Sequence, residues 1–219
     1  MAFSLSGVLF DVDGTLCDTN YLHAVAWSRA LREIGHEVPM AVLHRHIGMG
    51  SDRFTDEVIG EHSEIAGDAH RQYYREMWPD VRAFADAARL LRAVAAKGAT
   101  VLLASSADSD ELEMLRKAID ADDAITDATS SGDADASKPA PDIFQAALDS
   151  VDMGAKDALV VGDSVWDVLA AKKAGLECVG LLSGGIAASE LRQAGAIAIY
   201  DDPGDLLQNL QSSPLAPLF

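Results

Sequence analysis

The chain has 219 residues, 49% hydrophobic and 24% charged, which is enough to bury a large apolar core and is the profile of a globular protein rather than a disordered or fibrous one. Its 35 acidic residues outnumber 17 basic ones and give a formal net charge of -18, so neither nucleic acid nor an anionic membrane is an expected partner. The simplest interpretation of the charge is a solubility adaptation. An anionic substrate would then require a locally positive pocket.

The cysteine content and the hydropathy pattern indicate the cellular compartment. Only Cys17 and Cys178 occur, too few for a disulfide framework, and this suits a reducing cytoplasm. No run of about 18 apolar residues appears, and no basic segment is followed by a long apolar one. We therefore predict a cytoplasmic protein. We also expect it to be a monomer or a weak dimer.

The first predicted element is a short apolar strand at residues 7–10, and the pattern changes soon after it. From residue 16 to residue 82, amphipathic stretches such as 20–34 and 68–77 predict helices, and no clear strand appears. Glycines and prolines divide this region, so we expect an inserted bundle of about four helices.

Beyond the helical region, short apolar runs alternate with helical patterns. The predicted strands are 100–104, 158–161, 177–182 and 196–199, and the predicted helices are 108–119, 142–150, 165–174, 187–194 and 203–210. This alternation predicts an α/β fold with a Rossmann-like parallel sheet, formed by residues 1–15 and 83–219, with residues 16–82 as an inserted helical domain. Residues 212–219 are expected to form a loosely packed tail.

Three polar residues follow directly on predicted strands, namely Asp11, Ser105 and Asp163. In open parallel sheets, ligands bind at the carboxyl ends of the strands. Residues that are far apart in the sequence are therefore expected to meet at one edge of the sheet.

The segment from Asp11 to Thr15, with the sequence DVDGT, places two carboxylates one residue apart after a buried strand. Such a pair suits a nucleophile and an acid/base, and Gly14 permits a sharp backbone turn beside Asp11 and Asp13. A surface Asp-Gly turn is the alternative, but the full motif directly after an apolar strand is more specific.

Three further clusters carry groups that bind phosphate or metal. Ser105 places a hydroxyl at a strand end, Lys138 supplies a point charge before a proline, and Asp163 and Asp167 form a strand-end carboxylate pair that suits magnesium. Each has a simpler alternative: Ser105 or Ser106 as a helix cap, Lys138 as a solvated loop lysine, and Asp167 as a first-turn acid that favours the helix dipole.

Together these four segments resemble the haloacid dehalogenase-like hydrolase superfamily, whose motifs are D-x-D-G-T, a strand-end Ser or Thr, a Lys, and an acidic G-D-x-x-x-D. The resemblance extends over nearly the whole chain. The helical region at 16–82 looks like the cap of that family, and the order and spacing of the motifs resemble the branch of phosphoglycolate phosphatase and β-phosphoglucomutase.

The resemblance implies a phosphatase acting on a small phosphorylated metabolite such as a sugar phosphate or phosphoglycolate. Asp11 would attack phosphorus to give an aspartyl-phosphate, and Asp13 would protonate the leaving oxygen and later activate water. Ser105 and Lys138 would bind the transferring phosphoryl group. The expected substrate-binding residues are Gly14, Ser106, Arg53 and His23.

The resemblance also implies bound Mg²⁺ as the cofactor. Its ligands would be the Asp11 carboxylate, the Asp13 main-chain carbonyl and Asp163, with Asp167 orienting a ligand water or Lys138.

Two features discriminate between branches of the family. Displacement of halide from carbon needs no protonated leaving oxygen, so Asp13 argues against a dehalogenase. The phosphonate-cleaving branch uses a cap lysine, and residues 16–96 contain none. The remaining alternatives are a β-phosphoglucomutase-type mutase and a non-catalytic phosphoryl-binding or regulatory protein.

The candidate cap residues also keep simpler interpretations. Arg53 is expected to contact a second phosphate or a carboxylate of the substrate, but it equally suits a solvated helix arginine, and Arg45 competes for the same role. His23 suits a packed hinge residue better than a catalyst.

Overall fold

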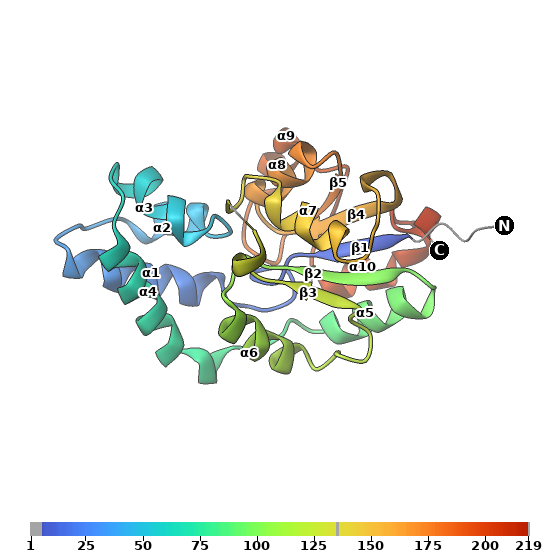
Figure 1. The fold of residues 1–219 in the computed structure, drawn as a ribbon, viewed down its shortest axis with the longest axis horizontal. Coiled ribbons are helices and arrows are strands. Elements are labelled where there is room, and N and C mark those ends of the chain that lie inside the picture. Colours follow the sequence, from blue (N-terminus) through green and yellow to red (C-terminus); the bar gives the residue numbers. More distant parts are fainter. Residues whose placement is uncertain (1–5, 135, 219) are drawn as a thin grey trace.

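The computed structural model describes residues 6–134 and 136–218, and its core is a six-stranded parallel sheet with the order β3-β2-β1-β4-β5-β6 (Figure 1). Its strands are β1 (Gly7–Phe10), β2 (Thr100–Ala104), β3 (Asp127–Thr129), β4 (Ala158–Gly162), β5 (Glu177–Leu181) and β6 (Ala198–Tyr200). The central strands β1, β2 and β4 are short apolar runs because helices cover both faces of the sheet.

The helices form two layers, one on each face of the sheet. They are α5 (Ala87–Ala96), α6 (Ser109–Ile119) and α10 (Pro203–Gln208) on one face, and α7 (Asp142–Asp149), α8 (Val165–Lys173) and α9 (Ala188–Ala194) on the other. Alternation along β1 sends Val8 and Phe10 into the first layer and Leu9 into the second. The predicted fold class, a parallel α/β core with an inserted helical domain, is confirmed.

Between β1 and α5 the chain forms four α-helices, α1 (Asn20–Glu33), α2 (Met40–His46), α3 (Ser51–Ile59) and α4 (Glu64–Glu76), which lie together beyond the carboxyl edge of the sheet (Figure 1). They enclose an apolar cluster of their own, in which the Trp27 ring stacks on Phe54 at a centroid distance of 4.0 Å. We call this four-helix group the cap.

The two chain segments that join the cap to the core run side by side. Asp18 N donates to Arg82 O at 2.9 Å, and Phe84 N donates to Leu16 O at 2.9 Å. The cap is therefore attached through a narrow two-stranded connection, which lies close to the boundaries predicted at residues 15/16 and 82/83. In the part of the chain that the structure describes, no helix is long and apolar enough to cross a membrane.

Two sequence-based expectations about the core need correction. The short edge strand β3 was not predicted, because three residues are too few to give a hydropathy pattern. The predicted loose tail is wrong over residues 212–218, since Leu215 is fully buried and Ser6 Oγ donates to Leu218 O. Phe219 lies outside the described residues.

Candidate active site

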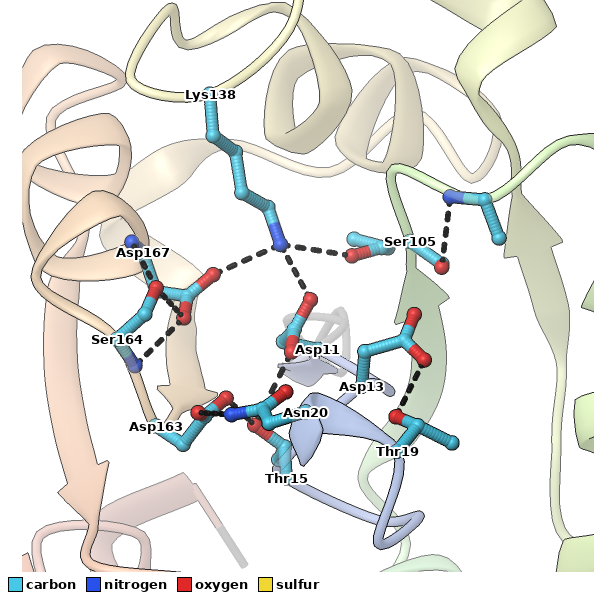
Figure 2. A network of polar contacts seen from close by, with 12 residues as sticks. Asp11, Asp13, Thr15, Thr19, Asn20, Ser105, Lys138, Asp163, Ser164 and Asp167 are labelled. Carbon is cyan, nitrogen blue, oxygen red and sulfur yellow. Dashed lines mark hydrogen bonds and ion pairs between the residues drawn. The ribbon is translucent and has the colours of Figure 1, made fainter. Parts of the chain in front are cut away.

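The carboxyl edge of the sheet brings the strand-end residues together, as the sequence predicted. Asp11 follows β1, Ser105 follows β2 and Asp163 follows β4, while Lys138 reaches the same point from the loop before α7 (Figure 2). Asp11, Lys138 and Asp163 are each at most 5% exposed. These charged groups are therefore held in a largely water-excluded environment.

Lys138 connects two carboxylates. Its Nζ donates to Asp11 Oδ1 and lies 2.7 Å from Asp167 Oδ1, with Ala104 O at 3.4 Å (Figure 2). Burial lowers the pKa of Lys138, but the charges of Asp11 and Asp167 outweigh burial and raise it. The lysine is therefore a fixed cation beside the candidate nucleophile, and not a solvated loop residue.

Asp167 has a double role in the local structure. It lies in the first turn of α8, where its Oδ2 accepts hydrogen bonds from Ser164 N at 3.0 Å and from Ser164 Oγ at 2.6 Å, forming a capping box. Its other oxygen faces Lys138. Asp167 therefore stabilises the start of α8 and pairs with Lys138 at the same time.

Asp163 is held by two residues of the segment that follows β1. Thr15 Oγ1 donates to Asp163 Oδ1 at 2.9 Å and lies 3.2 Å from Asp11 Oδ2, and Asn20 Nδ2 donates to Asp163 Oδ2 at 2.9 Å. A Cβ atom on Gly184 would lie 1.6 Å from Asp163 Oδ2. Glycine is therefore required at residue 184 for the backbone to approach this carboxylate.

The carboxylates of Asp11, Asp163 and Asp167 fit a divalent metal. Each offers one oxygen such that all three lie within 4.8 Å of one another. Burial, together with the charge of Asp167, raises the pKa of Asp11 to about 7 despite Lys138. Burial, together with the charges of Asp167 and Asp11, raises the pKa of Asp163 well above its usual value. One lysine does not balance three buried carboxylates, and a hard cation with oxygen ligands would.

Asp13 is held separately, on the side of the site that faces the cap. Its Oδ1 accepts from Thr19 Oγ1 at 2.6 Å (Figure 2). The same oxygen lies 3.3 Å from His23 Nε2. Burial alone would raise the pKa of Asp13, but the hydrogen bond and the charge of His23 outweigh burial and lower it. The two aspartates of the DVDGT motif therefore have different environments, as separate roles require.

Two residues that were not predicted, Glu111 and His70, lie against His23. Glu111 Oε1 of α6 lies 3.6 Å from His23 Nε2, and His70 Nε2 of α4 lies 3.2 Å from His23 Nδ1. Burial raises the pKa of Glu111 to about 8, with Asp13 and Asp108 adding to the increase and His23 opposing it. No sequence signal indicated either residue, because both lie in the middle of ordinary amphipathic helices.

A cavity of about 450 Å³ lies between the cap and the core, and Asp11, Asp13, His23 and Ser106 are among its lining residues. Ser105 is not among them: it is fully buried, and its Oγ accepts a hydrogen bond from Ala107 N at 3.1 Å. Ser106 Oγ has no hydrogen-bond partner among the described residues. The turn after β2 thus brings its second serine into the cavity lining, with the hydroxyl itself buried.

Arg53, the cap arginine that the sequence predicted to bind substrate, is not among the residues that line the cavity. Arg53 lies 3.6 Å from Glu57 one turn along α3, and Arg71 of α4 lines the cavity instead. Phe54 packs into the cap core against Trp27, which places its neighbour Arg53 beside that core and not over the site. Arg45, the competing candidate, pairs with Glu190 at 3.0 Å.

Gly14 serves the backbone at the centre of the site. Its φ of 75° lies in the left-handed region, and an added Cβ would lie 2.4 Å from Asp163 Oδ2. Its carbonyl accepts a hydrogen bond from Ser183 Oγ at 2.7 Å.

The fold and the site define a class of protein. It is a parallel α/β enzyme with a helical cap, whose site holds a buried aspartate, a buried lysine and a group of carboxylates that could bind a metal ion. The model of the haloacid dehalogenase-like hydrolase family matches residues 5–175, and the chain belongs to that family. The predicted enzyme class, a phosphoric monoester hydrolase of this family, is confirmed.

Curated relatives that are more than 30% identical to this chain include a plant protein and a bacterial enzyme. The protein Suppressor of Quenching 1 of Arabidopsis thaliana is 32% identical over 216 residues, which cover 94% of this chain but only 20% of that protein. A phosphoglycolate phosphatase of Nitrosospira multiformis is 31% identical over 184 residues, covering 78% of this chain and 80% of that enzyme. Among solved structures, a hydrolase from Pseudomonas syringae has a TM-score of 0.89 at 33% identity, covering 94% of this chain and 98% of that one.

Proposed function

We propose that this protein is a magnesium-dependent phosphatase that hydrolyses a small organic phosphomonoester through an aspartyl-phosphate on Asp11. The observation that carries the proposal is the pairing of Asp11, which lines the cavity, with the buried Lys138, together with the neighbouring carboxylates of Asp163 and Asp167. A carboxylate fixed by a buried cation, and open to a cavity on its other side, is suited to attack a phosphoryl group.

In the first step, an oxygen of Asp11 attacks phosphorus, and the bond from phosphorus to the leaving alcohol breaks. Lys138 stabilises the charge on the transferring oxygens, and main-chain amides beside Val12 and Ser106 complete the cradle. The negative charge of the bound phosphoryl group opposes the effect of His23 on the pKa of Asp13, so Asp13 takes up a proton in the substrate complex and gives it to the leaving oxygen. Thr19 and His23 hold Asp13 in place for this transfer, since both contact its Oδ1.

In the second step, Asp13 accepts a proton from a water molecule that attacks the phosphoryl group. The bond between phosphorus and the Asp11 oxygen breaks, which releases inorganic phosphate and restores the Asp11 carboxylate. The cap excludes other water from the cavity while the phosphoryl group is bound to Asp11.

The residues that would hold Mg²⁺ are Asp11 and Asp163 through their carboxylates and Asp13 through its main-chain carbonyl. Asp167 would lie behind these ligands, where its contact with Lys138 orients the lysine. The ion would supply charge neutralisation for the phosphoryl oxygens and for the carboxylates that face them.

Hydrolysis of p-nitrophenyl phosphate in the presence and absence of magnesium tests the proposal. Asp11→Asn is expected to reduce kcat by about 10⁴-fold or more because the nucleophile is lost. Asp18→Asn, an exposed aspartate in the same loop, is the matched control and should retain turnover. Acid quenching of the wild-type reaction should trap an acyl-phosphate on the Asp11 peptide. Full turnover by Asp11→Asn would overturn the proposal.

We further propose that the enzyme acts in the cytoplasm on a phosphorylated metabolite, as a monomer or a weak dimer. Free Cys17 and Cys178, both buried, support a reducing compartment. Gel filtration with light scattering at several protein concentrations tests the oligomeric state, and a tight dimer at submicromolar concentration would contradict it.

A further inference from the structure

The cavity has a second half, beyond the phosphoryl group, where the alcohol part of the substrate must lie. Three acidic residues line it between Asp11 and the cap, namely Asp13, Asp108 and Glu111. Asp108 caps the N-terminus of α6 and Glu111 lies in its first turn, so both carboxylates come from one helix end. This half of the cavity is electronegative.

The basic side chains that line the cavity do not offset this charge. His23 already faces two carboxylates, those of Asp13 and Glu111. Arg71 is bound to Asp68 in its own helix. Burial lowers the pKa of His70 well below its usual value, so this imidazole is neutral. Whether Glu111 is protonated or ionised, it adds no positive charge.

Other arginines of the cap are paired away from the cavity. Arg45 pairs with Glu190 at 3.0 Å, Arg53 lies 3.6 Å from Glu57, and Arg75 lies 3.6 Å from Asp110. Among the cavity-lining residues that the structure describes, His23 and Arg71 each have an acidic partner, and His70 is neutral. A second anionic group on the substrate would therefore meet carboxylates whose counter-charges are His23, shared between two of them, and Arg71, which is more than half exposed and screened by solvent.

Neutral polar groups also line this half of the cavity. Ser51, Ser106 and Ser131 line this space, and the Oγ of Ser106 is buried without a hydrogen-bond partner among the described residues. Hydroxyls of this kind both donate to and accept from the hydroxyls of a sugar or a polyol. Glu111 and Asp108 likewise accept hydrogen bonds from substrate hydroxyls.

From this lining we infer that the substrate is the monophosphate of a neutral polyhydroxy alcohol, and that a second anionic group on the alcohol is selected against. The inference rests on the proposed phosphatase function. It disfavours phosphoglycolate, whose leaving group carries a carboxylate. It also disfavours the mutase alternative, because transfer of a phosphoryl group from Asp11 to a sugar monophosphate creates a bisphosphate in this cavity.

Matched substrate pairs test the inference with the intact enzyme. 2-Hydroxyethyl phosphate and phosphoglycolate differ by a hydroxymethyl group in place of a carboxylate, and glucose 6-phosphate and 6-phosphogluconate form a second pair. In each pair, the neutral member is expected to have a kcat/KM at least about tenfold higher, since like charges that are brought together are penalised. An equal or higher kcat/KM for the anionic members would overturn the inference.

A pair of double variants tests the cause. Asp108→Asn/Glu111→Gln removes both carboxylates and retains an efficient N-cap, and it should reduce the preference for the neutral substrate about fivefold or more. Asp110→Asn/Glu113→Gln removes the same charge from exposed positions of α6 outside the cavity, and it should leave the preference within about twofold. Equal effects of the two double variants would overturn the inference.

The outcomes separate this inference from the proposed function. If p-nitrophenyl phosphate is hydrolysed in an Asp11-dependent manner and phosphoglycolate is preferred, only the substrate class is wrong. If Asp11→Asn retains turnover, the proposed function fails, and the substrate inference fails with it. The wild-type substrate ranking gives an answer even if a double variant does not fold.

Discussion

The core side and the cap side of the cavity are built in different ways. On the core side, Asp11, Lys138, Asp163 and Asp167 are almost completely buried and connected by short polar contacts. On the cap side, contacts with the core are of two kinds: buried ones from α1, such as Asn20 with Asp163 and His23 with Glu111, and exposed ones at the rim, such as the pair between Arg45 and Glu190. The groups assigned to chemistry are thus held by buried contacts, while the rim of the cap meets the core through exposed ion pairs.

This difference follows from the chain connections. Strands of the central sheet place the core residues, and buried charges lose less to solvent screening than exposed ones. The cap is joined through two adjacent segments, and exposed ion pairs contribute about 0–1 kcal/mol each. An enzyme that must admit a substrate and then exclude water needs this combination of a fixed base and a separable cover.

The largest expected effect is at the buried cation of the core side. Lys138→Met removes the positive charge that contacts both Asp11 and Asp167, and kcat for p-nitrophenyl phosphate should fall by about 10³-fold. Lys117→Met, at an exposed lysine paired with Glu113, is the control. Steady-state kinetics measure both, and a loss of less than tenfold for Lys138→Met would show that this contact is not catalytic.

The next effect concerns the candidate metal ligand. Asp163→Asn removes one carboxylate charge and keeps its size, so half-maximal activity should require about 10- to 100-fold more magnesium. Titration of activity with magnesium measures the change, with the exposed Asp149→Asn as control. An unchanged magnesium requirement would remove Asp163 from the ligand set.

A moderate effect is expected where the cap meets the core. His23→Phe keeps an aromatic ring stacked on Tyr74, at a centroid distance of 3.8 Å in the wild type, but loses the contact with Asp13. We expect kcat to fall about tenfold while thermal unfolding changes little. His36→Phe, at a half-exposed histidine of the cap, should not alter kcat. A wild-type kcat for His23→Phe would assign His23 to packing alone.

The smallest effect is expected at the rim. Arg45→Ala breaks an exposed ion pair with Glu190 and should change kcat/KM by no more than about threefold. The difference in kcat/KM between Arg45→Ala and the wild type is measured at several salt concentrations. Because salt screens exposed charges, this difference should become smaller as the salt concentration rises. A loss of a hundredfold would show that the rim contact, and not the buried core contacts, holds the cap in position.

Much of the core side was predictable from the sequence. Each strand of the core edge is a short apolar run, and its next polar residue must lie at the carboxyl edge of a parallel sheet, so Asp11, Ser105 and Asp163 could be placed without coordinates. The orientation of Ser105 was not predictable. Its hydroxyl turns toward Ala107 N, and Ser106 faces the cavity, because the local turn decides which of two adjacent serines points outward.

The cap side was predictable only as a set of helices. The pattern of residues 16–82 indicates amphipathic helices, but it does not determine which helix end or face lies over Asp11. Packing of Phe54 against Trp27 directs Arg53 away from the cavity, and α4 instead contributes His70 and Arg71. Glu111, from a core helix, meets His23 only because the cap and α6 lie against each other.

The sequence by itself determined the α/β class, the helical insertion and the chemical groups at the strand ends, because strand periodicity and the position of a residue after a strand are local properties of the chain. Only the tertiary structure decided the orientation of the cap, the burial of Leu215 and the acidic lining contributed by Asp108 and Glu111. These features depend on how separate amphipathic surfaces pack against one another, and hydropathy identifies such surfaces without identifying their partners.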